Sequence, residues 1–213
     1  MLNQVKTYLE YGNRFCGVEQ SIQKGEDIIY TTVLKKTKKD LDIENTTALR
    51  RGFANLQRHV RNMKRFGVHV IVAINHFTQD SQTELNLLKE LCSDIGVTAV
   101  ETDHWATGGQ GALALAEMVL SQLENPVAFK TLYPDDMFLW NKISMIATEL
   151  YGASEIVADK KIRDQIRAFQ DDYGHFPICM AKTQYSFSTD PQLRGAPDNH
   201  VVPIREIRLA AGA

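Results

Sequence analysis

Two stretches of the sequence end an apolar run in polar and aromatic side chains. Residues 70–74 are consecutively apolar and stop at Asn75 and Phe77, and residues 97–100 stop before a polar run that includes Trp105. Five apolar residues in a row predict a strand that is buried on both faces. Since strand ends in α/β sheets face ligands, we expect the two aromatic side chains to point into one crevice.

Phe77 and Trp105 are candidates for holding a flat ligand. Two aromatic rings at neighbouring strand ends can stack on a planar ring, with ~0.5–1.5 kcal/mol per pair beyond the burial of area. Packing in the core is the alternative for both side chains. The amide of Asn75 has two roles open to it, a hydrogen bond to the edge of a ligand or the capping of the next turn.

Glycines follow Trp105 and open the next predicted helix. The run Gly108-Gly109-Gln110-Gly111 allows backbone N–H groups to approach an anion at a helix N-terminus, where the helix dipole is also favourable. A tight turn between a strand and a helix uses glycine for backbone reasons alone, which is the alternative. Beside Trp105, we interpret Gly108, Gly109 and Gly111 as part of a pocket wall.

Two amphipathic helices are predicted around the first strand. Apolar residues recur at helical spacing across residues 47–65, and Gly67 closes this helix. Ser81 and Glu84 have the spacing of a capping box and begin a second helix that runs up to Gly96. The order strand, helix, strand, helix predicts parallel pairing with right-handed crossovers.

The remaining predicted elements are less regular in order. Residues 137–151 and 158–169 look like two successive helices joined by a loop through residues 152–154, which predicts a helical segment. The other predicted elements are strands, at residues 27–34, 177–182 and 201–210, the last two forming a C-terminal pair.

Composition excludes several classes of protein. The chain has 213 residues, 44% hydrophobic content and a formal net charge of −2, so no overall charge draws it to nucleic acid or a membrane. No apolar run reaches the ~20 residues that a membrane helix needs, and no signal peptide is evident. Three widely spaced cysteines favour a reducing compartment, and no histidine has metal-ligand spacing. We therefore expect a cytoplasmic protein without a metal site of its own.

A basic run crosses the first predicted helix. Residues 35–65 are rich in Lys and Arg and hold few acidic side chains, among them Asp40, Asp42 and Glu44. This run is able to receive an anionic substrate tail or a nucleotide. The alternative is a helix face that simply contacts water, which is the usual fate of basic residues on an amphipathic helix.

Four blocks of the sequence resemble the formate–tetrahydrofolate ligase family, also called the formyltetrahydrofolate synthetases. The blocks lie in the same order as in that family and cover about residues 26–213. They read RGFANLQRHVRNMKRFGVHVIVAINHF, then WATGGQGALALAE, then ICMAKTQYSFSTDPQLRGAP, and finally IREIRLAAGA. None of them is a generic phosphate motif.

The resemblance implies a fold and a reaction. The fold would be α/β, with the parallel strand–helix units of a P-loop-NTPase-like enzyme. The family uses ATP to activate formate as formyl phosphate and passes the formyl group to N10 of tetrahydrofolate. Phe77 and Trp105 match the positions of its folate-stacking pair, although the family pattern Asn-Arg-Phe-Pro reads Asn75-His76-Phe77-Thr78 here.

A second implied set of contacts follows the predicted strand at residues 178–181. Lys182, Gln184 and Tyr185 lie in a motif that borders the active region in the family, where they are able to contact phosphate or folate. The alternative is a loop that packs Tyr185 and Phe187 under the sheet.

One family motif is missing from the sequence. Family members carry an N-terminal P-loop, whereas this chain contains no G-x-x-x-x-G-K-[ST] and no Gly-Lys pair. We interpret it as a C-terminal, truncated portion, which binds tetrahydrofolate as a substrate and involves ATP and Mg²⁺ only when an N-terminal half is supplied. Whether the chain alone is an enzyme is left open.

The sequence therefore predicts three segments of the chain and leaves two functions open. Residues 1–25 are unassigned, residues 26–125 form the α/β folate-binding portion, and residues 126–213 form a C-terminal helical and strand portion. The first function is that of a ligase in one-carbon metabolism, with folate and formate as substrates. The alternative is a folate-binding or regulatory pseudoenzyme without ligase activity. Expected partners are a second copy of the chain or a complementing N-terminal half, with no nucleic acid and no membrane.

Overall fold

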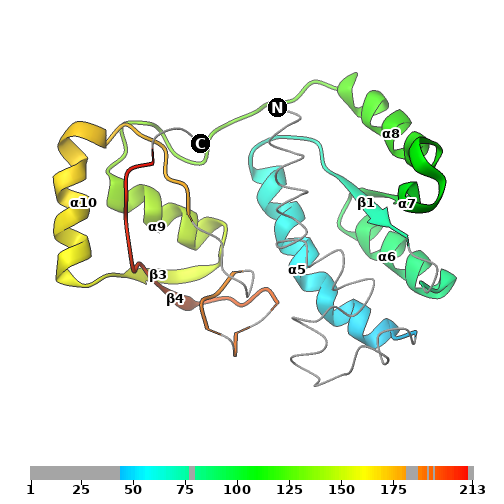
Figure 1. Ribbon diagram of the computed structural model, residues 1–213, viewed down its shortest axis with the longest axis horizontal. Coiled ribbons are helices and arrows are strands. Elements are labelled where there is room, and N and C mark those ends of the chain that lie inside the picture. The colour runs from blue at the N-terminus through cyan, green and yellow to red at the C-terminus, as the bar shows by residue number, and fades with distance from the viewer. Residues whose placement is uncertain (1–43, 77–79, 181–186, 191, 194, 211–213) are drawn as a thin grey trace. The chain divides into compact units, whose positions relative to one another are not determined.

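A pair of parallel strands lies at the centre of the first unit. The computed structural model describes residues 44–76, 80–180, 187–190, 192–193 and 195–210, and its chain divides into two compact units, Met1–Lys130 and Thr131–Ala213 (Figure 1). In the first unit, β1 (Ile71–Asn75) pairs in parallel with β2 (Thr98–Thr102). Both strands and their parallel pairing are confirmed, each strand ending one or two residues later than predicted. The strand predicted at residues 27–34 lies outside the described residues.

Helix α5 (Thr46–Arg65) supplies one side of the core. The Asn45 side chain accepts a hydrogen bond from the Ala48 N–H at 2.9 Å and so caps the helix. The chain then turns at Gly67, which has a φ of 71°. A side chain there would also overlap the Ala128 carbonyl, so only glycine fits. The predicted helix and its closing glycine are confirmed.

Helix α6 (Gln82–Asp94) connects the two strands and is bonded to α5 at both ends. Ser81 Oγ accepts from the Glu84 N–H at 3.2 Å, which confirms the capping box. Glu84 Oε1 accepts from the Asn45 N–H at 2.7 Å. At the other end, Lys64 Nζ donates to the carbonyls of Ile95 and Gly96, at 2.8 and 3.0 Å. These bonds fix α5 and α6 side by side with the same direction.

Burial of β1 on both faces was predicted, and this prediction is wrong for the described chain. Val72 and Ile74 are buried, whereas Ile71 and Ala73 on the other face are half-buried. The reason is that both helices pack on the same face of the strand. The buried residues of this core are Leu49, Phe53, Val60, Val72, Ile74, Leu85, Leu87, Leu88, Cys92 and Val97.

Three short elements follow β2. They are α7 (His104–Thr107), the 3₁₀ turn η2 (Gly108–Ala112) and α8 (Leu113–Leu123). Helix α8 lies beside β2. The helix predicted after the glycines is therefore present, and the glycines themselves form one turn of 3₁₀ helix.

The second unit is also built on a parallel strand pair. Its elements are α9 (Leu139–Glu149), β3 (Ala153–Val157), α10 (Lys160–Tyr173) and β4 (His200–Pro203), and β3 pairs with β4. The predicted loop between two successive helices is wrong, because residues 153–157 form a strand. The partner of that strand lies more than 40 residues further along the chain, so local sequence does not reveal it.

The predicted C-terminal strand pair is also wrong. Residues 177–180 have no regular structure, and residues 181–182 lie outside the described part of the chain. Only residues 201–203 of the last predicted strand are extended in a sheet, as part of β4, and their partner is β3. The apolar residues beyond Pro203 leave the sheet after a single further bond, from Ile204 N–H to the Val157 carbonyl at 2.8 Å.

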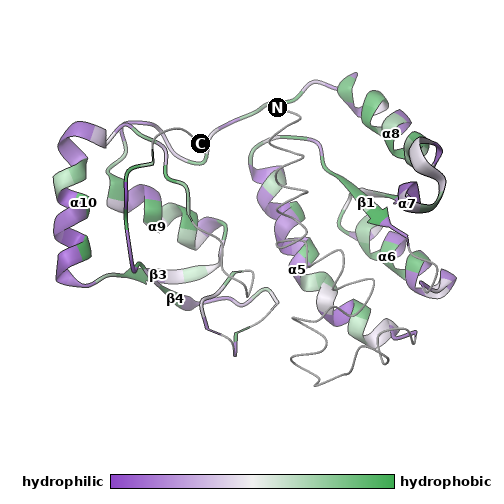
Figure 2. Ribbon diagram, viewed as in Figure 1, coloured by the Kyte–Doolittle hydropathy of each residue, from purple (hydrophilic) through white to green (hydrophobic). Residues whose placement is uncertain are grey.

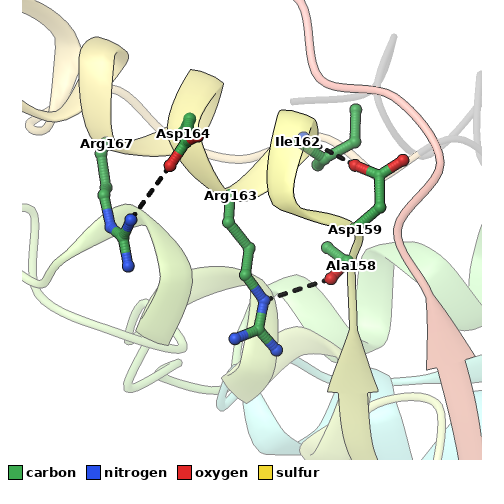
Figure 3. Close-up of polar contacts among 6 residues, drawn as sticks. All are labelled: Ala158, Asp159, Ile162, Arg163, Asp164 and Arg167. Carbon is green, nitrogen blue, oxygen red and sulfur yellow. Dashed lines mark hydrogen bonds and ion pairs between the residues drawn. The ribbon is translucent and has the colours of Figure 1, made fainter.

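Helix α10 begins at a side-chain cap. Asp159 Oδ1 accepts from the Ile162 N–H at 2.8 Å, directly after β3 (Figure 3). In the next turn Arg163 Nε donates to the Ala158 carbonyl at 3.1 Å, and its guanidinium lies 5.1 Å from the centre of the Trp140 ring. These contacts fix the start of α10 against the end of β3 and against α9.

A buried lysine connects two loops of the second unit, the one before α9 and the one after α10. Lys142 on α9 is fully buried, and its Nζ donates to the carbonyls of Asp135, Gly174 and Phe176 at 2.6, 2.8 and 3.0 Å. An ammonium group has three donors, so this lysine is completely satisfied. Its charge is stabilised by carbonyl dipoles from the loop before α9 and from the loop after α10.

The first unit predicts a measurable dependence of stability on pH. Burial, with a smaller effect of neighbouring Arg58, lowers the pKa of His59 on α5 from 6.5 to about 4. The unfolded chain therefore takes up the proton first, and stability is fully present above pH 6.5 and is lost as pH falls toward 4. We expect a loss of up to about 3 kcal/mol from this group, measured by urea unfolding at several pH values.

His59→Gln removes the titrating group and should flatten this pH dependence. The matched control is His69→Gln, at an exposed histidine of the same unit, which should leave the slope between pH 6.5 and 4 unchanged. An unchanged slope in His59→Gln would show that burial of His59 does not cause the effect.

Candidate functional site

The candidate site is built where β1 and β2 end together. Their register pairs Asn75 with Thr102, the last residue of each strand. Pairing continues for one more bond, because the His76 N–H donates to the Thr102 carbonyl at 2.8 Å. The buried Thr102 hydroxyl also donates to the Ile74 carbonyl at 3.2 Å. The two strand ends are therefore held at a fixed distance from one another.

Trp105 is attached to the end of β1 by its ring nitrogen. Its Nε1–H donates to the His76 carbonyl at 2.7 Å, although Trp105 belongs to α7 and follows β2. The side chain is 50% exposed, which is unusual for so large an apolar group. The structure thus brings Trp105 beside the strand end that carries Asn75 and His76.

Phe77, the predicted partner of Trp105, lies outside the described residues. It is the residue that follows His76 in the chain, and His76 is the residue that holds the indole. The aromatic clamp therefore stays a prediction. Asn75 is half-buried at the last position of β1, as its predicted role requires, and whether it contacts a ligand is likewise not tested.

The turn that carries Trp105 closes on itself through Asp103. The Asp103 carbonyl accepts from the N–H groups of Ala106 and Thr107, at 2.9 and 3.1 Å, and its carboxylate accepts from the Thr107 hydroxyl at 2.9 Å. The Asp103 N–H in turn donates to the Gly111 carbonyl at 3.3 Å. This network sets the position from which Trp105 reaches back to β1.

Two different physical constraints favour glycine in η2. A side chain at Gly111 would overlap both Asp103 Oδ1 and Thr107 Oγ1, so this position packs too closely for any other residue. Gly108 has a φ of 63°, and Gly109 faces open space. Gly111 is therefore required by packing within the turn, and this agrees with the alternative that the turn uses glycine for structural reasons. A contribution of Gly108 and Gly109 to a pocket wall stays a prediction.

Two helix N-termini of the first unit lie together. Helix α6 starts a few residues after β1 ends, and the start of α5 is bonded to it through Glu84 and the Asn45 N–H. Burial raises the pKa of Glu84, against the lowering effect of its backbone hydrogen bonds. The N-termini of α5 and α6 are therefore bonded to one another, and the positive ends of their dipoles favour negatively charged groups beside them.

Sequence reasoning missed the residues that position Trp105. His76 acts through its backbone carbonyl, and Thr102 and Asp103 act through hydrogen bonds inside the turn. A carbonyl acceptor leaves no signature in residue types, so no motif could have identified His76. The Asp103-x-x-x-Thr107 spacing was the available signal for the closed turn.

The second predicted group of contacts lies outside the described part of the chain. Lys182, Gln184 and Tyr185 belong to it, so their predicted contacts with phosphate or folate stay a prediction. The residues on either side are well anchored. The Ile178 N–H donates to the Tyr133 hydroxyl at 2.9 Å, and the buried Phe187 meets Tyr151 edge-on with ring centres 6.0 Å apart.

No group of three or more His, Cys, Asp or Glu side chains that could hold a metal ion occurs among the residues that the structure describes. Burial raises the pKa of the Cys92 thiol to about 11, so this cysteine is a neutral core residue. Among the described helices, none is both long and apolar enough to cross a bilayer.

Comparison with known proteins matches this chain to one family. The family model described as formate–tetrahydrofolate ligase matches residues 24–213. A formate–tetrahydrofolate ligase of Sinorhizobium fredii is 58% identical over 179 residues, which is 83% of this chain and 32% of that protein. Ligases of Granulibacter bethesdensis and Pelagibacter ubique are 53% and 54% identical, over 81% and 83% of this chain and 31% and 32% of their own lengths. The chain thus spans about a third of the length of these curated relatives.

The close packing at Gly111 generates a prediction for the turn of Trp105. Gly111→Ala should destabilise the chain by about 1–3 kcal/mol, because the new methyl group overlaps Asp103 and Thr107. It should also shift the indole N–H resonance of Trp105 in an NMR spectrum. The matched control is Gly109→Ala, which enters open space and should change stability by less than about 0.5 kcal/mol. Equal effects of the two substitutions would contradict the packing argument.

Proposed function

The chain belongs to the formate–tetrahydrofolate ligase family, and from this premise we propose that it provides the folate-binding portion of such a ligase. In the family reaction, ATP, formate and tetrahydrofolate give 10-formyltetrahydrofolate, ADP and phosphate. The proposed ligand is tetrahydrofolate as a substrate, bound where β1 and β2 end. We place the protein in the cytoplasm, where one-carbon metabolism supplies this substrate.

The position of Trp105 is the observation that carries this proposal. Its indole N–H is bonded to the His76 carbonyl while half of the side chain is exposed. A pterin is flat, polarisable and apolar on its faces, so an aromatic side chain at a strand end can bind it by stacking. A side chain that is already held in place loses little conformational entropy when the ligand binds.

Phe77 is the proposed second side of the clamp. It follows His76, the residue that fixes Trp105, so one short segment of chain connects the two halves of the clamp. Asn75 is proposed to bond the polar edge of the pterin, while Gly108 and Gly109 line the pocket. Lys182, Gln184 and Tyr185 are proposed to contact phosphate or the polar atoms of folate.

The ATP-dependent step is assigned to a different part of the family fold. Activation of formate requires phosphate charge to be neutralised by backbone donors, a lysine and Mg²⁺, which a P-loop supplies in one segment. This sequence contains no such motif, and the described residues do not bring three metal ligands together. We infer that its parallel strand pairs belong to a P-loop-NTPase-like sheet, to which ATP and Mg²⁺ bind elsewhere.

A second candidate is a folate-binding or regulatory protein without ligase activity. The absence of a P-loop from the 213 residues favours it, because the sequence then lacks the motif that supplies the phosphate contacts of an ATP site in one segment. Both candidates share the same folate site. They differ in whether a polypeptide that carries a P-loop restores turnover.

Binding of tetrahydrofolate should depend on both aromatic side chains. In a Trp140→Phe background, titration with tetrahydrofolate should quench the fluorescence of Trp105 with saturation. Phe77→Ala should weaken binding by about 1–2 kcal/mol, or roughly 5- to 30-fold, because a stacked ring is lost. Trp105→Ala, followed by calorimetry, should have a similar effect.

The matched control for the clamp is Phe138→Ala. Phe138 is 65% exposed and belongs to the second unit, so its removal should leave tetrahydrofolate affinity unchanged. Unaltered affinity in both Phe77→Ala and Trp105→Ala would refute the clamp. A loss of affinity in Phe138→Ala that equals the loss in Phe77→Ala would show that the effect is not specific.

The chain alone should not make 10-formyltetrahydrofolate from ATP, formate and tetrahydrofolate. The three groups that an ATP site needs would have to come from separate loops of this chain. The measurement is a product assay on pure protein, repeated with the remaining part of a relative such as the Sinorhizobium fredii ligase. Turnover by the chain alone that stops when ATP is omitted, and that Trp105→Ala abolishes, would contradict this assignment of the two steps.

A further inference from the structure

Helix α8 is apolar on two sides, and one of them faces water. Leu115, Met118 and Val119 are half-buried, on the side of the helix next to β2. Leu120 and Leu123 are 64% and 74% exposed. None of the eleven residues of this fully described helix is buried. Figure 2 shows the helix coloured as hydrophobic along most of its length.

The exposed apolar residues form one stripe. Leu113, Ala116, Leu120 and Leu123 are spaced by three, four and three residues, which places them on one side of an α-helix, and we call this set the α8 outer face. Leu113 is 50% exposed. Since half-buried residues occupy the opposite side, the helix has the pattern of one that is enclosed from both directions.

The strands of the same unit give a second, independent sign of a missing layer. Parallel sheets are nearly always covered on both faces, and two strands alone are rarely stable. Here α5 and α6 cover the face of β1 that carries Val72 and Ile74, while Ile71 and Ala73 on the other face stay half-buried. Within the described residues of this unit, one face of the sheet therefore has incomplete cover.

The length of the relatives offers an occupant for this surface. The family match runs without interruption through α8, yet the chain spans only about a third of the Sinorhizobium fredii ligase. In those relatives, some 68% of the protein's length is therefore available to enclose the helix (100% less the 32% covered). We propose that the α8 outer face is the docking surface for that remaining part of the ligase polypeptide. This inference rests on family membership and does not depend on the folate clamp.

The chemistry of the surface matches such an occupant. The α8 outer face holds three leucines and an alanine, and the charged side chain on α8 is Glu117, beside the stripe. Interfaces of this composition resemble the interior of a domain more than a transient contact. The partner surface is therefore apolar as well, and the contact is a permanent part of the folded ligase.

Binding by the rest of a relative tests the proposal. The probe is the Sinorhizobium fredii ligase without the stretch that matches this chain, immobilised and titrated with the full 213-residue chain. Leu120→Glu and Leu123→Glu should each weaken binding at least about tenfold, because a carboxylate would be buried in an apolar contact. Ser121→Glu is the matched control on the same helix, beside the stripe, and should stay within about twofold of the unchanged chain.

A second measurement decides the question if the probe does not fold. Side-chain footprinting with a carbene reagent is carried out on this chain and on the intact Sinorhizobium fredii ligase. The leucines of α8 should be labelled at least about five times more slowly in the intact relative, at the matching helix, because they are enclosed there. Equal labelling in the two proteins overturns the proposal, as does probe binding that Leu120→Glu and Leu123→Glu leave unchanged.

Two further outcomes distinguish this docking surface from a dimer interface and from the folate site. If the chain self-associates through these leucines in sedimentation experiments and does not bind the probe, the occupant is a second copy and the proposal is wrong. Tetrahydrofolate binding is measured on the same variants and should be unchanged by Leu120→Glu. If the unchanged chain binds tetrahydrofolate but not the folded probe, the docking proposal has failed. If it binds the probe but not tetrahydrofolate, the proposed folate site has failed.

Discussion

Parallel pairing of β1 with β2 is the interaction on which the candidate site depends. It places Asn75 opposite Thr102, and the bond from the His76 N–H to the Thr102 carbonyl extends the pairing by one residue. The peptide of His76 is thereby fixed, and its own carbonyl is aimed at the indole of Trp105. A shift of one residue in this register would turn the side chains of β1 to the opposite face and remove that acceptor from reach.

A second constraint acts from the other end of the turn. A side chain at position 111 would overlap the Asp103 carboxylate and the Thr107 hydroxyl, which are bonded to each other, so the closed turn requires glycine there. Trp105 is therefore positioned twice, by the closed turn that carries it and by the strand that accepts its N–H. Such double attachment explains how a side chain that is half exposed can keep a single position.

The elements that the sequence could predict are those whose signals are local. Helix α5, helix α6 and its capping box, and both strands of the first unit follow from periodicity, caps and closing glycines. Strand β3 could not be found in this way. It has five residues, and its partner β4 lies more than 40 residues away, so its existence depends on a contact that no local pattern contains. The error at the C-terminus has the same origin, because β4 pairs with β3 and not with the apolar segment before it.

For the candidate site, residue types predicted its location but not the contacts that position its side chains. Trp105 and Asn75 were identified from their places at strand ends, and the strand ends do lie together. The groups that orient Trp105 are a backbone carbonyl, a turn carboxylate and a glycine chosen for packing. Carbonyls are common to all residues, so only the pairing of the strands shows that the carbonyl of His76 matters.

The family assignment and the arrangement of the first unit suggest that folate binding and ATP chemistry belong to different parts of the ligase fold. We propose that one part of the ligase fold holds folate at the end of a parallel strand pair, and that the ATP chemistry belongs to another part, which encloses α8. In this account the chain binds folate even without the part of the ligase that carries out phosphoryl transfer. The central claim is therefore that Trp105, in the chain as it stands, forms a face of the folate site.

Fluorine NMR of the chain labelled with 5-fluorotryptophan tests this claim most directly. The protein has two tryptophans, Trp105 in the first unit and Trp140 in the second, so each gives its own resonance and Trp140 serves as an internal control. On addition of tetrahydrofolate, the account predicts that the Trp105 resonance shifts with saturation while the Trp140 resonance stays in place. A Trp105 resonance that does not move when tetrahydrofolate is bound, or a shift confined to Trp140, would contradict it.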